Sequence, residues 1–349
     1  MLTRLMYAYL LIIYTFCNSG NPDLNVYTWT YNNKIYTTSP GFDAMMLICR
    51  NIGLPFVVFK GLCGIFILIF YRKSLRLFFS EENTVLALML IYPFVSSIAQ
   101  IRNGMMAALI LYAICQFIFD PKHRIMPFII KIALAMLIHP VAFVYLVLLL
   151  SKKNFKETKK SKLVVGILLA LLVELILIQN PLYDLAKTFI SNPKYLSWFD
   201  FQHAFEMVTE ETLNIKGQLL PVFEQLLGSA LVIYMTIKYK EKYLNNNCKT
   251  QSNYIVVLQE EQLDIIKNIF LLLLFVLPMY QLTPTYFRIF MNLVPLIYII
   301  GIQLVGDSKQ RGTIPKSFVY LALIVYAVIL AYFSALGYRI SMLNSFSIS

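Results

Sequence analysis

The chain of 349 residues is 59% hydrophobic, has a mean hydropathy of +0.68 and carries charge on only 14% of its residues. Soluble domains are typically about 25% charged, so this composition excludes an ordinary soluble protein and indicates a membrane protein with several spans. The net charge of +12 does not indicate a nucleic-acid partner, because lysine and arginine are concentrated in short loops between apolar runs. The five cysteines offer no spacing for a disulfide framework or a CxxC metal site.

Residues 1–71 predict two spans joined on the outer side. Leu5–Cys17 predicts a retained first helix, with a cleaved signal peptide as the alternative. Asn18–Pro40 is rich in tyrosine and asparagine and predicts an outer loop, since such side chains suit a membrane interface or stacking on sugars. Phe42–Ile52 has apolar residues at helical spacing and predicts a helix lying on the membrane surface. Leu54–Tyr71 predicts a span that ends on basic cytoplasmic residues.

The next two apolar runs predict a helix pair with a polar segment at its outer end. Thr84–Ala99 runs outward with a kink at Pro93, and Asn103–Phe119 returns to a basic cytoplasmic turn. Between them, Gln100–Gly104 is polar and contains Arg102. A full charge near the hydrocarbon is costly and indicates a functional site; the alternative is an ordinary turn whose arginine reaches lipid phosphates.

Ile125–Leu150 predicts two half-helices that meet at His139-Pro140. One continuous helix would place the lysines of Ser151–Lys162 outside, against the positive-inside rule. Pro140 supplies the break, because proline cannot donate the helical hydrogen bond and pushes its predecessor out of the helical region. His139 is therefore expected near the middle or outer side of the membrane, where irregular backbone must be buried in protein or line a water-filled cavity.

The remaining chain predicts one external region and further spans. Leu163–Ile178 crosses outward, and residues 179–217, with mixed charge and many aromatics, predict a folded external loop. The later spans are predicted at Leu219–Ile237, Ile269–Met279, Ile289–Val305 and Phe318–Leu336. The predicted fold is all-α: a polytopic transmembrane bundle of about ten or eleven passes, two of them half-length, in a single integral membrane domain over residues 1–349.

This topology predicts that basic groups converge at the outer face. Arg102 and Arg288 are expected at the outer ends of helix pairs and His139 at the tip of a broken hairpin, so they can share one cavity. Arginine binds phosphate through two parallel hydrogen bonds and stays charged, so a lipid diphosphate is the expected anion. The alternatives are an Arg288 that reaches head groups beside Tyr286, and a His139 ring that caps carbonyls freed by Pro140.

The order of these motifs resembles that of a known family. The resemblance is to the EpsG-type polysaccharide polymerases, which belong with the O-antigen polymerases called Wzy. The motifs that carry it are Gln100–Ala113, Ala133–Ala142, Asp23–Tyr27, Ser39–Phe42 and Tyr286–Ile289. An acid is expected where Ser39 stands, so the resemblance assigns Ser39 no catalytic role.

The resemblance implies a bacterial inner-membrane glycosyltransferase that works on the periplasmic side, in the synthesis of O-antigen lipopolysaccharide or another surface polysaccharide. Such an enzyme moves a growing glycan from its undecaprenyl diphosphate carrier onto the end sugar of a new lipid-linked repeat unit, without a nucleotide sugar, metal or cofactor. Preplaced arginines would stabilise the charge that develops on the departing diphosphate. The expected partners are lipid-linked oligosaccharides and membrane lipids, with a chain-length regulator and a flippase as further candidates.

Roles follow for individual residues. Arg102 and Arg288 are expected to bind the diphosphate. His139 either joins them or acts as the base on the acceptor hydroxyl, and Asp23 is the second candidate base. The residues expected to contact sugars or support the site are Gln100, Asn103, Tyr27 and Tyr286.

Other classes of protein remain open. An O-antigen ligase would use similar arginine and histidine chemistry with lipid A core as acceptor. A lipid-linked oligosaccharide flippase would need a cationic cavity, but its charges are expected along the bundle interior, whereas here most are predicted at the outer face. A membrane acyltransferase would use His139, but it usually needs a partner acid that the sequence does not locate.

Overall fold

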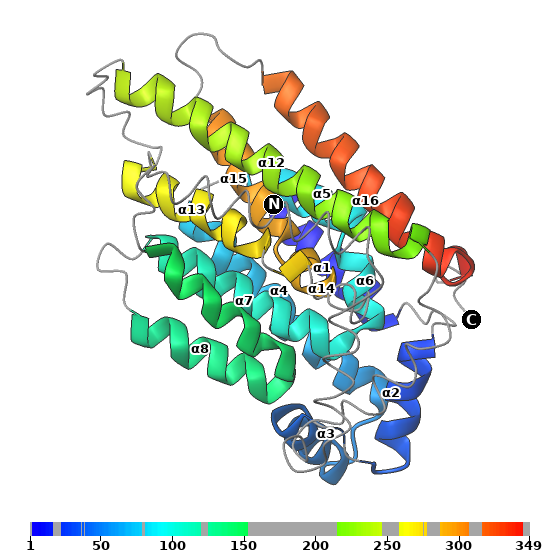
Figure 1. Cartoon of the computed structure of the whole chain (residues 1–349). Coiled ribbons are helices and arrows are strands. Elements are labelled where there is room, and N and C mark those ends of the chain that lie inside the picture. The colour runs from blue at the N-terminus through cyan, green and yellow to red at the C-terminus, as the bar shows by residue number, and fades with distance from the viewer. Residues whose placement is uncertain are drawn as a thin grey trace. The chain divides into compact units, whose positions relative to one another are not determined.

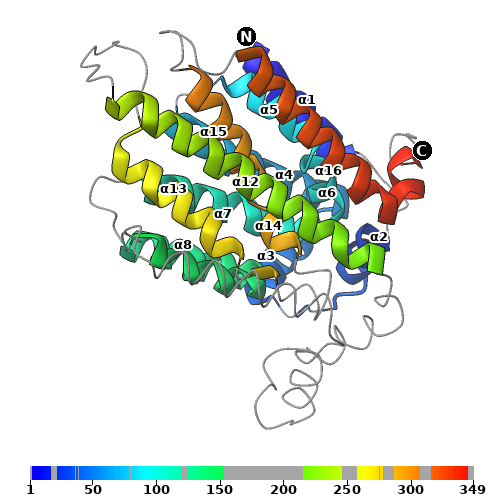
Figure 2. The same ribbon diagram turned by 45° about the horizontal axis from the view of Figure 1, so that its top comes forward.

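The computed structural model describes residues 2–16, 22–35, 37, 39–78, 81–119, 125–152, 215–245, 258–274, 276–277, 287–306 and 316–344. Within these ranges every regular element is a helix (Figures 1 and 2), which confirms the all-α class. By length and composition, one described helix, α7 (Ile101–Phe119), is apolar and long enough to cross a membrane. It is buried along most of its length, as expected for a helix surrounded by others.

The described residues pack as two compact units. The first lies within Met1–Leu146, Met235–Gln262 and Asn292–Ser349, and the second within Val147–Tyr234 and Leu263–Met291. The helices wholly in the first unit, besides α7, are α1 (Leu2–Phe16), α2 (Pro22–Asn32), α3 (Pro40–Asn51), α4 (Phe56–Phe78), α5 (Glu82–Ile91), α6 (Phe94–Ala99), α8 (Ile125–Ile138), α15 (Val294–Gly306) and α16 (Lys316–Asn344). The 3-10 helix η1 (Pro140–Lys152), α12 (Ile215–Asn245) and α13 (Glu260–Leu273) have residues in both units, and α14 (Phe287–Met291) lies in the second.

The centre of the first unit is α7, which packs against α4 and α8; α4 also packs against α1. Figures 1 and 2 both show α7 running beside α8. Gly104 allows the first turn of α7 to approach its neighbours closely, because a Cβ there would lie 2.9 Å from Ser97 Cβ and 3.2 Å from Ile67 Cδ1. The turn that carries Arg102 is therefore held tightly against α6 and α4.

Both predicted proline breaks are confirmed. α5 ends at Ile91 and α6 begins at Phe94, on either side of Pro93. α8 ends at Ile138 and η1 begins at Pro140, which leaves His139 between two apolar helices. The His139 amide still donates to the Ala135 carbonyl at 2.9 Å. The break in Ile125–Leu150 thus follows from the chemistry of one proline, while its depth in a membrane stays a prediction.

The predicted outer loop Asn18–Pro40 was wrong in part, since α2 occupies Pro22–Asn32. Pro22 suits a first helical turn and Asp23 complements the helix dipole there. Leu24 and Tyr31 are buried and Tyr27 is half-buried, so one helix face is covered by the protein. Tertiary packing of this face stabilises a helix that the polar composition did not predict.

Three predicted boundaries were also wrong. α4 continues past Tyr71 to Phe78, because buried Leu75 and Phe78 extend its apolar stripe. The run predicted from Ile269 is helical from Glu260, where two glutamates suit the first turn of α13. The predicted span Ile289–Val305 is interrupted between α14 and α15, where Pro295 lies at the start of the second helix. The confirmed helices are α1 for Leu5–Cys17, α3 for Phe42–Ile52, α7 for Asn103–Phe119, and the longer α12 and α16 for Leu219–Ile237 and Phe318–Leu336.

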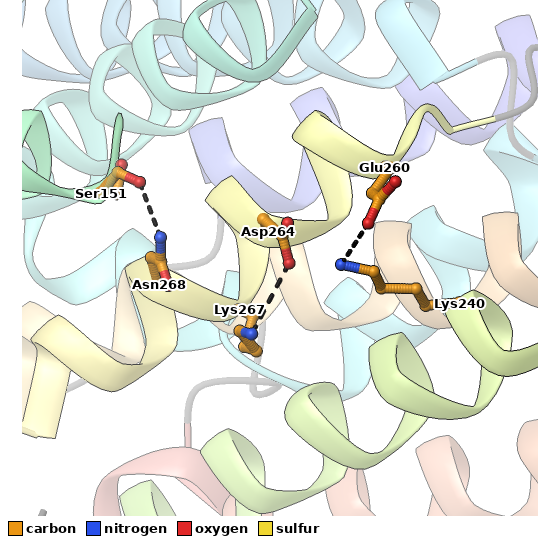
Figure 3. A network of polar contacts seen from close by, with 6 residues as sticks. All are labelled: Ser151, Lys240, Glu260, Asp264, Lys267 and Asn268. Atoms are coloured by element: carbon orange, nitrogen blue, oxygen red, sulfur yellow. Dashed lines mark hydrogen bonds and ion pairs between the residues drawn. The ribbon is translucent and has the colours of Figure 1, made fainter. Parts of the chain in front are cut away.

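Short polar contacts occur within each unit, both between elements and within α13 (Figure 3). In the second unit, Asn268 donates to the Ser151 carbonyl at 2.9 Å, and Lys267 lies 3.6 Å from Asp264. In the first unit, Lys240 and Glu260 form an ion pair of 2.8 Å. The predicted span Leu163–Ile178, the predicted external loop 179–217 and Tyr286 lie outside the described residues. The number of passes and the single-domain organisation stay predictions.

Candidate functional site

Arg102 lies in the first turn of α7, and two neutral side chains hold its guanidinium. Its Nε donates to Tyr27 Oη at 3.2 Å, and its Nη1 donates to Ser39 Oγ at 3.1 Å. The guanidinium carbon lies 5.6 Å from the centroid of the Tyr27 ring, a distance at which the ring face attracts a cation. The structure thus brings together Arg102 and Tyr27, two predicted site residues from separate helices, and adds Ser39.

Ser39 directly precedes α3, where hydrogen bonds among Thr37, Ser39 and Asp43 hold its backbone. Its side chain is fully buried, and its carbonyl accepts the first helical hydrogen bond from the Asp43 amide at 2.9 Å. The Asp43 carboxylate accepts from the Thr37 amide at 2.9 and 3.0 Å and from the Thr37 hydroxyl at 2.8 Å. The same hydroxyl accepts from the Ser39 amide at 3.2 Å. These bonds hold the backbone of Ser39, whose hydroxyl accepts from Arg102.

Tyr27 is supported by a group of aromatic rings. Its ring meets Phe42 edge-on with centroids 5.8 Å apart, and Phe42 meets Phe59 in the same way at 5.5 Å. Phe59 in turn stacks on Tyr31 at 5.2 Å. The group joins α2, α3 and α4 through pairs of the kind that stabilise packed interiors, so the ring beneath Arg102 is held on several sides.

The charge of Arg102 has no acidic partner among the described residues. Its described polar contacts are those to the Tyr27 and Ser39 hydroxyls, both neutral acceptors. Its position in the first turn of α7 adds the partial positive charge of a helix N-terminus to its own. A half-buried arginine has the chemistry to bind an anion with oxygen acceptors, because its two described hydrogen bonds use only part of its N–H groups; that Arg102 binds one stays a prediction.

The residues on either side of Arg102 belong to a buried polar network. Asn103 and Asn292 exchange amide hydrogen bonds of 3.1 and 3.2 Å, and Asn292 also donates to Tyr145 Oη at 3.1 Å. Gln100 accepts a longer bond of 3.5 Å from Asn103. Gln100 and Asn103 therefore support the first turn of α7 from within the unit. The structure gives them this role, whereas contact with sugars stays a prediction.

His139 lies half-buried at the break after α8, and α3 packs against the end of that helix. A Cβ on Gly41 would lie 2.9 Å from both Cβ and the carbonyl oxygen of Leu137, so the two backbones meet here. His139 Nδ1 accepts a long bond of 3.4 Å from the Val141 amide. The predicted alternative has the ring cap carbonyls freed by Pro140, whereas in this contact the ring accepts from a backbone amide, so that alternative also stays a prediction. Catalysis by His139 stays a prediction.

Three further predicted site residues are placed differently. Asp23 lies in the first turn of α2, one helical turn before Tyr27, and is half-buried. Arg288 is half-buried on α14, within the second unit. Tyr286 lies outside the described residues. The predicted convergence of Arg102, Arg288 and His139 on one cavity therefore stays a prediction.

Sequence reasoning missed several residues of this site. Ser39 was noted only as a departure from a resemblance, and its contact with Arg102 spans 63 positions. Asn292 and Tyr145 gave no signal, because a lone polar residue within an apolar run does not identify its partner. Asp43 was not predicted to belong to the site. Within the described residues, no three His, Cys, Asp or Glu side chains gather as a metal site would require.

Comparison with known proteins identifies the family. No curated protein and no solved structure matches the chain. The model of the EpsG family matches residues 2–344, nearly the whole sequence. The chain therefore belongs to the EpsG family, which makes it a membrane protein of the polysaccharide polymerase type.

Proposed function

We propose that this protein is a bacterial inner-membrane glycosyltransferase that polymerises oligosaccharide repeat units carried on undecaprenyl diphosphate. In this proposal the helices form a polytopic bundle and the site around Arg102 faces the periplasm. The growing glycan leaves its diphosphate carrier and is transferred to the end sugar of another lipid-linked repeat unit. The product serves O-antigen lipopolysaccharide or another surface polysaccharide. Membership in the EpsG family supports the reaction class.

The observation that carries the proposal is the setting of Arg102. Hydrogen bonds to Tyr27 and Ser39 orient its guanidinium, and no described carboxylate cancels its charge. As the glycosidic bond breaks, negative charge develops on the diphosphate, so a fixed cation stabilises the transition state more than the ground state. The N-terminus of α7 adds partial positive charge at the same place. In this mechanism Arg102 binds the leaving diphosphate.

The acceptor side of the reaction needs a base. His139 and Asp23 are the two candidates, and Asp23 lies on the same helix as Tyr27, one turn away. Arg288 is proposed as a second ligand for the diphosphate, and Tyr27 and Tyr286 as contacts for sugars. A chain-length regulator and a flippase are the proposed partners. The roles of these residues extend the proposal, and each can be tested by substituting the residue.

The test uses the full chain in lipid nanodiscs with undecaprenyl diphosphate-linked repeat units as the sole substrate. We expect a ladder of lengthened glycans from the wild type, and single repeat units from Arg102→Ala. Arg72→Ala is the matched control, because Arg72 also lies over a tyrosine ring, that of Tyr7 at 5.8 Å, near the end of α4 that is predicted to be cytoplasmic. The control should keep the ladder.

Three outcomes would overturn all or part of this proposal. A full ladder from Arg102→Ala would remove the proposed role of the arginine. Absence of any ladder from the wild type, with transfer only after lipid A core is supplied, would indicate a ligase in place of a polymerase. Movement of the substrate across vesicles without any new glycosidic bond would indicate a flippase.

A further inference from the structure

We propose that Ser39 is a positioning residue for Arg102, a neutral acceptor that orients the guanidinium while leaving its charge for the anion. The proposal rests on the function proposed for Arg102 and specifies how that anion site is tuned. It also gives a role to a position where the resemblance led us to expect an acid. Three contacts within the first unit support this role for Ser39.

The first contact is the hydrogen bond from Arg102 Nη1 to Ser39 Oγ, 3.1 Å long, with Ser39 fully buried. A carboxylate in the same place would form an ion pair with the guanidinium, and the pair would carry no net charge. A hydroxyl accepts one bond from the same N–H and adds no charge. Ser39 therefore directs the guanidinium and preserves its attraction for an anion.

The second contact is between Thr37 and Asp43, the acid in the first turn of α3. The Asp43 carboxylate accepts three hydrogen bonds from Thr37, between 2.8 and 3.0 Å, from the amide and the hydroxyl. Arg102 makes its described hydrogen bonds to Tyr27 and Ser39. Thr37 thus satisfies the Asp43 carboxylate, and Asp43 makes no hydrogen bond or ion pair with Arg102 among the described residues. The Thr37 hydroxyl also accepts from the Ser39 amide, so Thr37 contacts both Asp43 and Ser39.

The third contact restrains the remaining freedom of the guanidinium. Tyr27 Oη accepts from Nε at 3.2 Å, so the two bonds hold different nitrogens of the planar group. Among the described residues no hydrogen bond involves Nη2 or the second N–H of Nη1, and these N–H groups suit a pair of phosphate oxygens. Because the side chain is already ordered, less conformational entropy is lost on binding. Loss of the Ser39 hydroxyl should therefore weaken binding of the anion through Arg102.

The test measures binding of farnesyl diphosphate, a short isoprenoid diphosphate, to the full chain in nanodiscs. Ser39→Ala should weaken binding about tenfold, in keeping with a lost hydrogen bond to a charged group. Ser39→Thr, which restores a hydroxyl, should bind within about threefold of the wild type. Ser39→Asp should weaken binding about a hundredfold, because a carboxylate would pair with Arg102. Thr28→Asp is the control, since Thr28 lies beside Tyr27 on α2 and its hydroxyl bonds within that helix to Leu24 at 2.9 Å.

The double variant separates positioning from a purely structural role. If Ser39 acts through Arg102, adding Ser39→Ala to Arg102→Ala should cause no further loss of binding. A further loss equal to that of Ser39→Ala alone would overturn the proposal. Unchanged binding in both Ser39→Ala and Ser39→Asp, with binding lost in Arg102→Ala, would overturn the role of Ser39 alone. Unchanged binding in Arg102→Ala would instead overturn the function proposed for the arginine. If Ser39→Asp does not fold, the Ala and Thr variants decide the question.

Discussion

Asn103 and Asn292 hold each other through two buried amide hydrogen bonds of 3.1 and 3.2 Å, although 189 positions separate them in the chain. Asn103 follows Arg102 directly, and Asn292 lies between α14 and α15. The pair thus joins the turn that carries the candidate anion ligand to the last third of the sequence. Tyr145 on η1 accepts a further bond from Asn292, so three distant segments meet at this point.

Removal of one partner of this pair should destabilise the protein. Asn292→Ala leaves the Asn103 amide buried without its partner, and we expect a loss of about 1 to 3 kcal/mol in the free energy of unfolding. Chemical denaturation in detergent measures it. In a double-mutant cycle with Asn103→Ala, the two losses should be less than additive, by about 1 kcal/mol. Full additivity would show that the two amides do not interact.

Gly104→Ala should disturb both stability and activity. The new Cβ would lie 2.9 Å from Ser97 Cβ and 3.2 Å from the Ser97 carbonyl oxygen, so the first turn of α7 must shift. We expect a loss of about 1 to 3 kcal/mol and a shortened glycan ladder, because Arg102 shifts with the turn. Gly301→Ala is the comparison, since its Cβ would meet the flexible end of Leu323 at 3.0 Å. Equal losses at the two glycines would contradict this explanation.

Gly41→Ala should act on the loop that carries Ser39. Its Cβ would lie 2.9 Å from the Leu137 carbonyl oxygen, and backbone cannot give way as a side-chain end can. We expect α3 to separate from the end of α8, with a loss of about 1 to 3 kcal/mol and reduced polymerisation. Thermal unfolding and ladder length on the same preparation measure both effects. Wild-type stability in this variant would show that α3 and α8 are not in close contact.

Substitutions of Tyr27 separate its two contacts with Arg102. Tyr27→Phe keeps the ring near the guanidinium and removes the hydroxyl that accepts from Nε, so we expect a rise in KM for the lipid-linked repeat of about three- to tenfold. Tyr27→Ala also removes the ring and its contact with Phe42, and the effect should be larger. Steady-state kinetics in nanodiscs give both values. A Phe variant as impaired as the Ala variant would assign the whole effect to the hydroxyl.

Local chemistry explains which features of the fold could be predicted. Pro93 and Pro140 end helices because each lacks an N–H group, and this property needs no knowledge of the rest of the molecule. α7 follows in the same way from an unbroken apolar run. α2 did not follow, because the face formed by Leu24, Tyr27 and Tyr31 is covered only in the folded unit, where Phe42 of α3 and Phe59 of α4 pack against the two tyrosines. Their spacing of three and four residues was the signal available in the sequence.

For the candidate site too, some features could be predicted from the sequence and others could not. The sequence by itself determined that Arg102 lies at the start of an apolar helix and that His139 lies at a helix break, because both depend on a few neighbouring residues. Only the tertiary structure decided that Tyr27 and Ser39 hold Arg102, and that Asp43 bonds to Thr37. Hydrogen bonds between distant segments depend on how closely the helices pack. At Gly41 and Gly104 this close packing is possible because the residue has no side chain. A chain can show where a charge lies, but the partners that orient this charge are set by packing.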